Sequence, residues 1–207
     1  MRITLITDVA QQPDLNKRLH YALQALGPLP FQLSIWMRDK ELGLADATIW
    51  ADRWRWLCER HGLRFEISLA HAALIQPGDV IHVPDVPQMR HQAHQHYRDH
   101  LRILSLHGLD QLGIALANRE VELLLSPLYR PLSKPATGPL LDRKGLESLK
   151  RAERERIHLM GGLTAKRITP LVGGRFAGYC LLGAWLRQPE ELLGQLAALP
   201  SPDGAGL

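Results

Sequence analysis

The chain has 207 residues, of which 45% are apolar and 22% charged, and it contains no repeated low-complexity tract. This composition excludes a disordered or fibrous protein and predicts one globular core. The formal net charge is +4, but the basic residues are scattered among Asp and Glu, so no basic patch predicts nucleic-acid binding and a phosphorylated small molecule is an equally good partner.

Short apolar runs alternate along the chain with longer amphipathic stretches, which is typical of repeated strand–helix units. Eight runs are expected as strands, at residues 3–8, 31–37, 64–68, 80–83, 102–107, 121–127, 157–162 and 176–182. Helices are expected at residues 15–26, 47–62, 109–118, 145–155 and 164–172, with a short one ending before Gln76 and a last one through Leu199. Gly62 is predicted to end its helix and Thr164 to begin one.

Eight such units without a linker predict a single-domain α/β fold, a closed (β/α)8 TIM barrel over residues 1–199. An open, doubly wound sheet is the alternative. Residues 200–207, PSPDGAGL, are expected to form a disordered tail. In a TIM barrel the chemistry lies at the C-terminal ends of the strands, so the residues there are the candidates for function.

Two glycine-containing turns at strand ends predict a phosphate site. Gly161-Gly162 ends the seventh strand and Gly183-Ala184 the eighth, each just before a helix. Glycine lets the backbone approach an anion, and the N–H groups of a helix N-terminus point towards it. After the second strand, alternation places Arg38 and Lys40 on one side, where two cations could hold a diphosphate.

The fifth strand ends in Ser105-Leu106-His107, so the serine and the histidine are expected on the same side. A histidine there could exchange protons near neutral pH. The run MRHQAHQHYRDH at residues 89–100 offers four histidines at helical spacing, for which a polar helix face is the preferred interpretation and a metal site the alternative.

The start of the chain and its cysteines bear on the compartment. The stretch MRITLITD is too short and polar for a signal peptide, and no apolar run approaches the roughly 18 residues of a membrane span. We therefore expect a cytoplasmic protein that does not enter a membrane. Cys58 and Cys180 lack ligand-like spacing and are expected as buried free thiols.

Taken in order, the blocks LITD, WMRDKEL, VIHVPD, LSLH, LLSPLYRPLSKP, LMGGLT and FAGYCLLGAW resemble the family of thiamin phosphate synthases and TenI-like thiazole tautomerases. The resemblance spans nearly the whole chain and implies a TIM barrel that binds a small phosphorylated thiazole. In a synthase the second substrate is an aminopyrimidine diphosphate, whose leaving diphosphate is held by basic residues and Mg²⁺. A homodimer is a further expectation from this resemblance.

The resemblance also assigns roles to individual positions. Asp85 matches an acidic ligand of Mg²⁺, and His107 matches the histidine that moves protons in the tautomerases. The remaining positions would contact phosphate or diphosphate; they are Arg38, Lys40, Ser105, Ser133, Lys134, Gly161, Gly162, Gly183 and Ala184.

The sequence departs from the synthase pattern at several positions. Trp36 stands where the synthases have a glutamine, and an indole lacks the paired donor and acceptor of an amide. Ser68 and Leu69 stand where the synthases carry an Asn-Asp pair whose aspartate binds magnesium. The losses at Trp36, Ser68 and Leu69 concern the pyrimidine and the metal.

Pro131 and Ser133 stand where the lysine loop of the family has two threonines, so one hydroxyl is lost. Gly183 stands where a serine is expected, which costs a side-chain donor but keeps the backbone N–H groups. The anchor glycines and His107 are kept.

Three functions remain open. A TenI-like tautomerase needs an acid/base and a phosphate anchor but no cofactor, which fits the losses best. A divergent synthase would couple the pyrimidine to the thiazole phosphate and would need Mg²⁺, and Lys40 and Lys134 favour it. A non-catalytic regulator that binds a phosphorylated ligand on the same barrel is the third.

Overall fold

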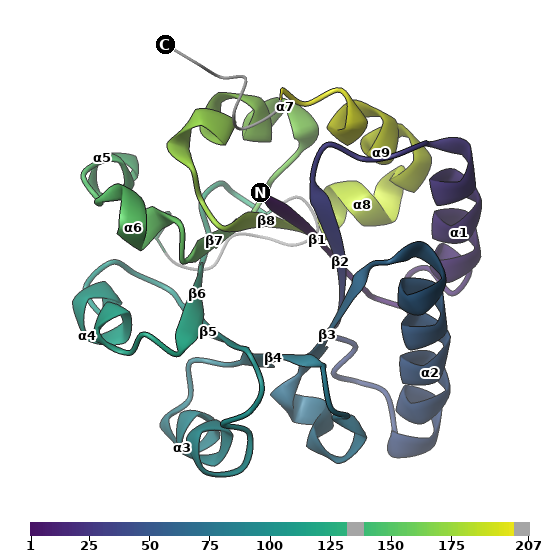
Figure 1. Cartoon of the computed structure of the whole chain (residues 1–207), viewed down its shortest axis with the longest axis horizontal. Helices are drawn as coiled ribbons and strands as arrows, with labels where there is room; N and C mark the ends of the chain where they lie inside the picture. Colours follow the sequence, from purple (N-terminus) through teal and green to yellow (C-terminus); the bar gives the residue numbers. More distant parts are fainter. Residues whose placement is uncertain (132–138, 201–207) are drawn as a thin grey trace.

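The computed structural model describes residues 1–131 and 139–200. Eight parallel strands pair in chain order, and β8 pairs back onto β1, so the sheet closes into a barrel (Figure 1). The predicted TIM barrel is confirmed, and the open sheet is wrong. The strands are β1 (Arg2–Ile6), β2 (Gln32–Met37), β3 (Arg64–Ser68), β4 (Val80–Val83), β5 (Arg102–Leu106), β6 (Val121–Leu125), β7 (Ile157–Met160) and β8 (Gly178–Leu181).

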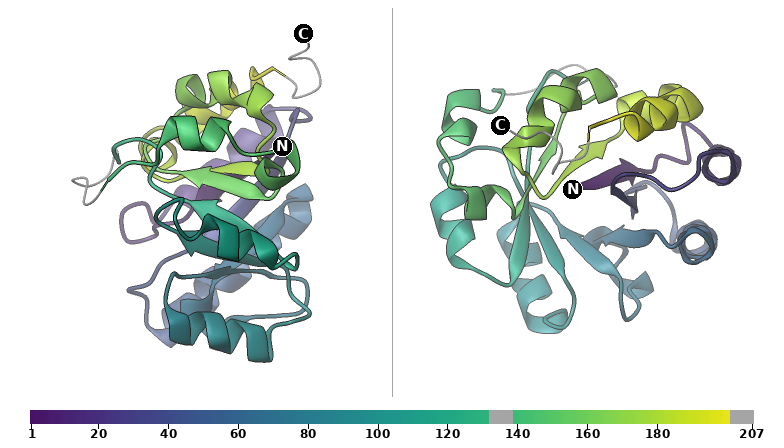
Figure 2. Two further views of the ribbon diagram at one scale, coloured as in Figure 1. Left: turned by 90° about the vertical axis from the view of Figure 1, so that its left-hand side faces the viewer. Right: turned by 45° about the horizontal axis from the view of Figure 1, so that its top comes forward.

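Helices surround the barrel, as the views in Figure 2 also show. They are α1 (Leu15–Ala25), α2 (Leu44–His61), α3 (Pro87–His96), α4 (Leu112–Ala117), α5 (Arg143–Glu147), α6 (Arg151–Arg154), α7 (Ala165–Ile168), α8 (Gly183–Arg187) and α9 (Pro189–Ala197), with 3-10 turns η1 (Leu69–Leu74) and η2 (Thr169–Gly174). Both predicted caps are confirmed. Gly62 ends α2 with a left-handed φ of 64°, and the Thr164 side chain accepts a hydrogen bond from the Arg167 N–H at the start of α7.

Three helices that were each expected to be continuous are divided. The one expected at 164–172 is the short α7 followed by the 3-10 turn η2. Lys150 is extended between α5 and α6, and Glu153 accepts a hydrogen bond from the Lys150 N–H, which starts α6 as a new helix. Gln188 is not helical between α8 and α9, because a residue before proline avoids the helical conformation, and Pro189 then begins α9. The long predicted helix after β8 is therefore a short helix followed by a second one.

Two buried layers fill the molecule. The main core lies between the outward faces of the strands and the helices and includes Trp54 and Trp185, both fully buried. A smaller cluster contains Ile6, Trp36, Ile103, Leu124 and Cys180. Because alternate residues of a strand face opposite sides, this smaller cluster is the barrel interior.

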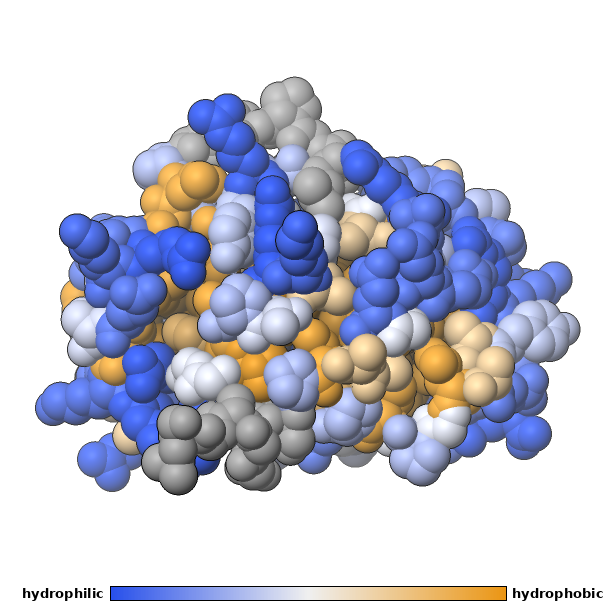
Figure 3. All heavy atoms as spheres, turned by 90° about the horizontal axis from the view of Figure 1, so that it is seen from above, coloured by the Kyte–Doolittle hydropathy of each residue, from blue (hydrophilic) through white to orange (hydrophobic). Residues whose placement is uncertain are grey.

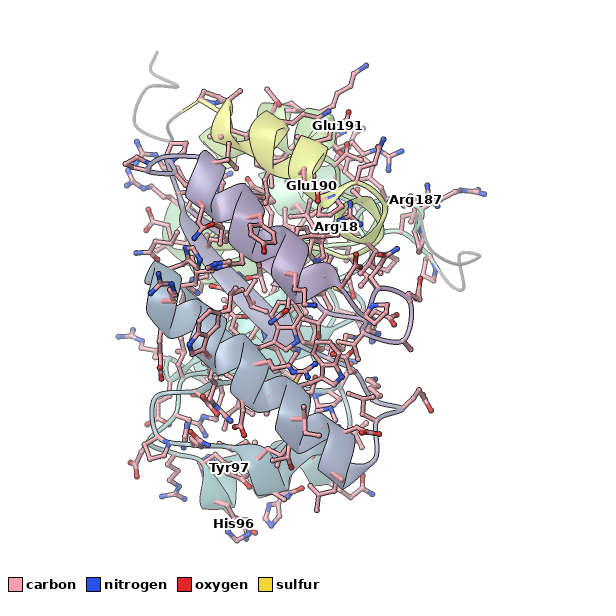
Figure 4. The ribbon with its side chains drawn as sticks, turned by 90° about the vertical axis from the view of Figure 1, so that its right-hand side faces the viewer. Arg18, His96, Tyr97, Arg187, Glu190 and Glu191 are labelled. Carbon is pink, nitrogen blue, oxygen red and sulfur yellow. The ribbon has the colours of Figure 1, made fainter. Side chains whose placement is uncertain are left out.

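The first and last helices meet where the ring closes. The guanidinium of Arg18 on α1 donates two hydrogen bonds, of 2.8 and 2.7 Å, to the carboxylate of Glu190 on α9, and the two side chains lie together in Figure 4. The pair is exposed and contributes about 1 kcal/mol or less. Packing of apolar side chains from α1 and α9 into the main core therefore contributes most of the closure.

The surface and the cysteines are as expected for a globular chain. The face that lies uppermost in Figure 1 is mostly hydrophilic, with hydrophobic side chains showing between the charged ones (Figure 3). Within residues 1–131 and 139–200 no helix has the length and apolar character that crossing a bilayer requires. Cys58 and Cys180 are free and buried, and burial raises the pKa of the Cys58 thiol to about 12.

Candidate active site at the C-terminal mouth of the barrel

The C-terminal ends of β1, β2 and β8 surround a pocket of about 270 Å³. Arg38 and Lys40 both line it, so the structure brings together the two cations that follow β2. Leu182 contributes the β8 side. The other lining residues are Thr7, Asp8, Ala10, Asp39, Glu41 and Leu42.

Asp39 holds this pocket in shape. Its carboxylate accepts hydrogen bonds from the Thr7 hydroxyl and, at 2.5 Å, from the Val9 N–H, while the Thr7 hydroxyl accepts one of 3.3 Å from the Arg38 N–H. These bonds join the end of β1 to the end of β2. The Asp39 carboxylate thus holds together the two loops that carry the pocket lining.

Arg38 is well suited to bind an anion. Its side chain is partly buried, with the guanidinium carbon 6.0 Å from the centre of the Trp36 ring. Burial lowers its pKa, and the charges of Asp8 and Asp39 offset part of that effect, but a guanidinium remains protonated at any ordinary pH. A cation that has lost part of its water binds a phosphate group more strongly than an exposed one.

Trp36 closes the barrel interior below this pocket. Only 5% of its surface is exposed, its ring stacks on that of His82 with centroids 3.6 Å apart, and its indole N–H donates a hydrogen bond of 3.0 Å to the Ser68 hydroxyl. His82 in turn lies 2.6 Å from the carboxylate of Glu66, which is fully buried. The positions that differ from the synthase pattern, Trp36 and Ser68, are therefore bonded to each other.

The Glu66–His82 pair carries one negative charge into the interior. Burial alone raises the pKa of Glu66, but the hydrogen bond and charge of His82, with the charges of His158 and Arg2, outweigh burial and hold that pKa below its usual value. Burial lowers the pKa of His82, and its bond to Glu66 offsets only part of this. At neutral pH we infer an ionised Glu66 whose carboxylate accepts a hydrogen bond from the ring N–H of a neutral His82.

His107 lies across the barrel, just after β5. It is exposed, and its Nδ1 is 3.4 Å from the Ser126 hydroxyl after β6. Ser105 is half-buried and lies on the same side of β5 as the interior residue Ile103. His107 does not line the pocket around Arg38, so the two predicted parts of the site lie on different sides of the mouth.

The two glycines after β7 have a structural reason to be glycine. Gly161 has a φ of 108°, and a Cβ there would lie 2.7 Å from the Cα of Pro127. Gly162 has a φ of 57°, and a Cβ there would lie 2.2 Å from the Arg130 carbonyl oxygen. The turn thus packs directly on the segment after β6, which is enough to require both glycines without a ligand.

Gly183 and Ala184 are the first two residues of α8, a five-residue helix that follows β8 before the longer α9. A short extra helix at this place is the element that often completes the phosphate site of TIM barrels. The prediction of one continuous helix missed this division. Its signal was present in the sequence, because Gln188-Pro189 is a boundary.

The candidate metal ligand is engaged elsewhere. The Asp85 carboxylate forms an ion pair with Arg90, and in the part of the chain that the structure describes no three His, Cys, Asp or Glu residues gather as a metal would require. On α3, His94 contacts the Arg98 guanidinium at 3.1 Å. Ser133 and Lys134 lie outside the described residues.

Several residues of the site were missed by sequence reasoning. Thr7, Asp39 and Leu182 stand in the blocks LITD, WMRDKEL and FAGYCLLGAW, but the sequence assigned them no role. The interior pair Glu66 and His82 lies inside apolar runs. The sequence did indicate that Glu66 and His82 are buried, since each stands between apolar neighbours. The alternation of side chains along a strand places both on the side that faces the barrel interior.

No protein-family model matches the chain, and no curated protein matches it in sequence. Solved structures do resemble it. The thiamine phosphate pyrophosphorylase of Pyrococcus furiosus superposes with a TM-score of 0.68 at 14% identity, covering 99% of this chain and 97% of that one. The enzyme of that name from Bacteroides thetaiotaomicron gives 0.60 at 14%, covering 96% and 97%. Phosphoribosyl anthranilate isomerase of Thermotoga maritima gives 0.60 at 14%, covering 99% of each chain. At these identities the likeness establishes the TIM-barrel fold alone.

Proposed function

We propose that this protein is an enzyme that acts on a small phosphorylated heterocycle at the C-terminal mouth of its barrel. Its reaction is the proton transfer of a TenI-like thiazole tautomerase. Arg38 and Lys40, with the turn that begins α8, hold the phosphate. His107 moves the proton, since an exposed imidazole at a strand end can take and return one near neutral pH.

The observation that carries this proposal is the packing of Trp36. In the resemblance its position belongs to pyrimidine recognition and Ser68 belongs to the metal side, yet here the indole stacks on His82 and donates to the Ser68 hydroxyl. A second ring cannot occupy the volume that the indole fills. One substrate that needs a phosphate anchor and an acid/base fits what remains.

The second candidate is a thiamin phosphate synthase. Two cations in one pocket favour it, because Arg38 and Lys40 together match the charge of a diphosphate. The described residues do not fit the Mg²⁺ it would use, since Asp85 is paired with Arg90 and Ser68 is bonded to Trp36. The tautomerase therefore stands first.

The test is a comparison of histidine variants in an assay for aromatisation of the thiazole phosphate tautomer. His107→Ala should lower turnover by about 100-fold or more while the affinity for the aromatic product stays unchanged. His91→Ala, on the outer face of α3, is the matched control and should behave as wild type. Turnover that survives in His107→Ala would remove the role assigned to His107.

A third variant tests the anchor. Arg38→Gln should weaken binding of the phosphorylated product by about tenfold, because one charge-assisted contact is lost. Measured by calorimetry, binding without any turnover in the wild type would favour the non-catalytic regulator instead.

A further inference from the structure

A second pocket lies at the opposite end of the barrel from the candidate active site. Its volume is about 750 Å³, within the range of small-molecule sites. The starts of β1, β2 and β3 contribute Arg2, Gln32 and Arg64, so the pocket opens at the N-terminal mouth. The other lining residues are Leu23, Gly27, Pro28, Leu29, Phe31, Leu33, Ser34, His61, Gly62, Leu63, Phe65 and Gly78.

The wall of this pocket combines cationic and apolar side chains. Arg2 and Arg64 supply two guanidinium groups, and none of the lining residues is acidic. Phe31, Leu29 and Phe65 supply an apolar surface. Such a wall matches a small molecule with an anionic head and an apolar body.

Arg64 differs from Arg2 and Arg55, which are also partly buried. Arg2 pairs with Glu122 at 3.1 Å, and Arg55 pairs with Asp79 at 2.7 Å. Among the residues that the structure describes, the Arg64 side chain has neither an ion pair nor a hydrogen bond. Burial lowers the pKa of Arg64 and the charge of Arg2 lowers it further, with only partial compensation from Glu66 and Glu122. The fold thus carries a desolvated cation without a partner, which costs stability.

A buried hydroxyl in the same wall is also unpaired. Ser34 is 0% exposed and lines the pocket, and its Oγ has no hydrogen-bond partner within the described ranges. A buried hydroxyl without a partner is uncommon and costs free energy. An anion placed against Arg64 would accept hydrogen bonds from both groups and remove both costs at once.

We propose that the N-terminal mouth of the barrel is a second binding site, for a small carboxylate or phosphate that carries an apolar or aromatic body. Its head lies on Arg64 and Ser34, with Arg2 beside it, and its body lies against Phe31 and Leu29. This site is separate from the candidate active site, because its pocket and the pocket around Arg38 have no lining residue in common.

The experiment uses phenylacetate and phenyl phosphate as aromatic anions, 2-phenylethanol as the neutral analogue, and inorganic phosphate as the head alone. Binding to the full-length protein is measured by calorimetry and by NMR. Arg64→Gln should weaken binding of the aromatic anions by about tenfold or more, and Ser34→Ala by less. Arg119→Gln, which removes an exposed arginine, should leave binding unchanged.

Two comparisons make the proposal falsifiable. Arg38→Gln should keep this binding, so loss in Arg38→Gln with retention in Arg64→Gln would place the anions at the C-terminal mouth and overturn the inference, whatever the fate of the proposed function. Equal binding of 2-phenylethanol would also overturn it. The ratio of phenylacetate to phenyl phosphate affinity then distinguishes a carboxylate from a phosphate ligand. Ligand-free Arg64→Gln should melt at or above the wild-type temperature, which shows that a loss of binding is not a loss of fold.

Discussion

Glu122 has the clearest electrostatic role of any single residue in the barrel. Its carboxylate accepts hydrogen bonds of 2.7 Å from His158 and 3.1 Å from Arg2. Burial alone would raise its pKa, but the bond and charge of His158 and the charges of Arg2 and Arg64 outweigh burial and lower the pKa to about 2. A lowered carboxyl pKa stabilises the folded state above the ordinary value of 4.5, and this contribution is lost as the pH falls towards 2.

We therefore predict that the folded state loses stability in acid, and that protonation of Glu122 causes a large part of the loss. Lowering the pH from above 4.5 towards 2 should remove up to roughly 3 kcal/mol that Glu122 contributes, as urea denaturation at several pH values would measure. In Glu122→Gln the free energy of unfolding should fall less over the same pH range. In Glu120→Gln, which changes an exposed neighbour, it should fall as much as in the wild type. Equal pH dependence in wild type and Glu122→Gln would refute this assignment.

The interior charges also show what the sequence could and could not predict about residues. Glu66, His82, Glu122 and His158 each stand inside an apolar strand at an inward position, so their burial follows from alternation. Their pairing does not. It depends on the register of neighbouring strands, which places His82 opposite Ser68 and brings its ring to Glu66, and register is a property of the closed barrel.

At the scale of elements, the turn after β7 is the most constrained connection. Gly161→Ala should lower the free energy of unfolding by roughly 2 kcal/mol or more, because a left-handed φ is strained for alanine and the new Cβ would meet Pro127. Gly113→Ala in α4 meets nothing within 4 Å and should be neutral or stabilising by roughly 1 kcal/mol. Chemical denaturation of the two variants measures the contrast, and similar effects at both positions would contradict the packing described.

The same turn limits what its sequence could reveal about function. A glycine pair before a helix predicted a phosphate site, but close packing on Pro127 and Arg130 requires those glycines in any case.

Strands were predictable from their apolar runs, and β3 and β4 begin and end where expected. The hydrophobic pattern does not predict the divided helices, because Lys150 and Gln188 interrupt them through local backbone conformation. Of these two breaks, only the one at Gln188 has a signal in the sequence, the proline that follows it.

At the scale of the whole molecule, the barrel was predictable because eight strand–helix units without a linker leave few other architectures. Its two mouths were not equally predictable. Motifs at the strand ends identified Arg38 and Lys40, which share one pocket. The N-terminal pocket combines residues from the starts of three strands and the turns before them, and no motif links those positions in sequence.

The central claim is that the C-terminal mouth performs proton transfer on one phosphorylated substrate. The measurement that tests it most directly is incubation of the purified protein with the thiazole phosphate tautomer, with and without aminopyrimidine diphosphate and Mg²⁺, followed by NMR and mass spectrometry. We predict the aromatic thiazole phosphate in every arm, including those without Mg²⁺. Thiamin phosphate that forms only when both the pyrimidine and Mg²⁺ are present, without aromatisation in their absence, would contradict the claim and establish the synthase.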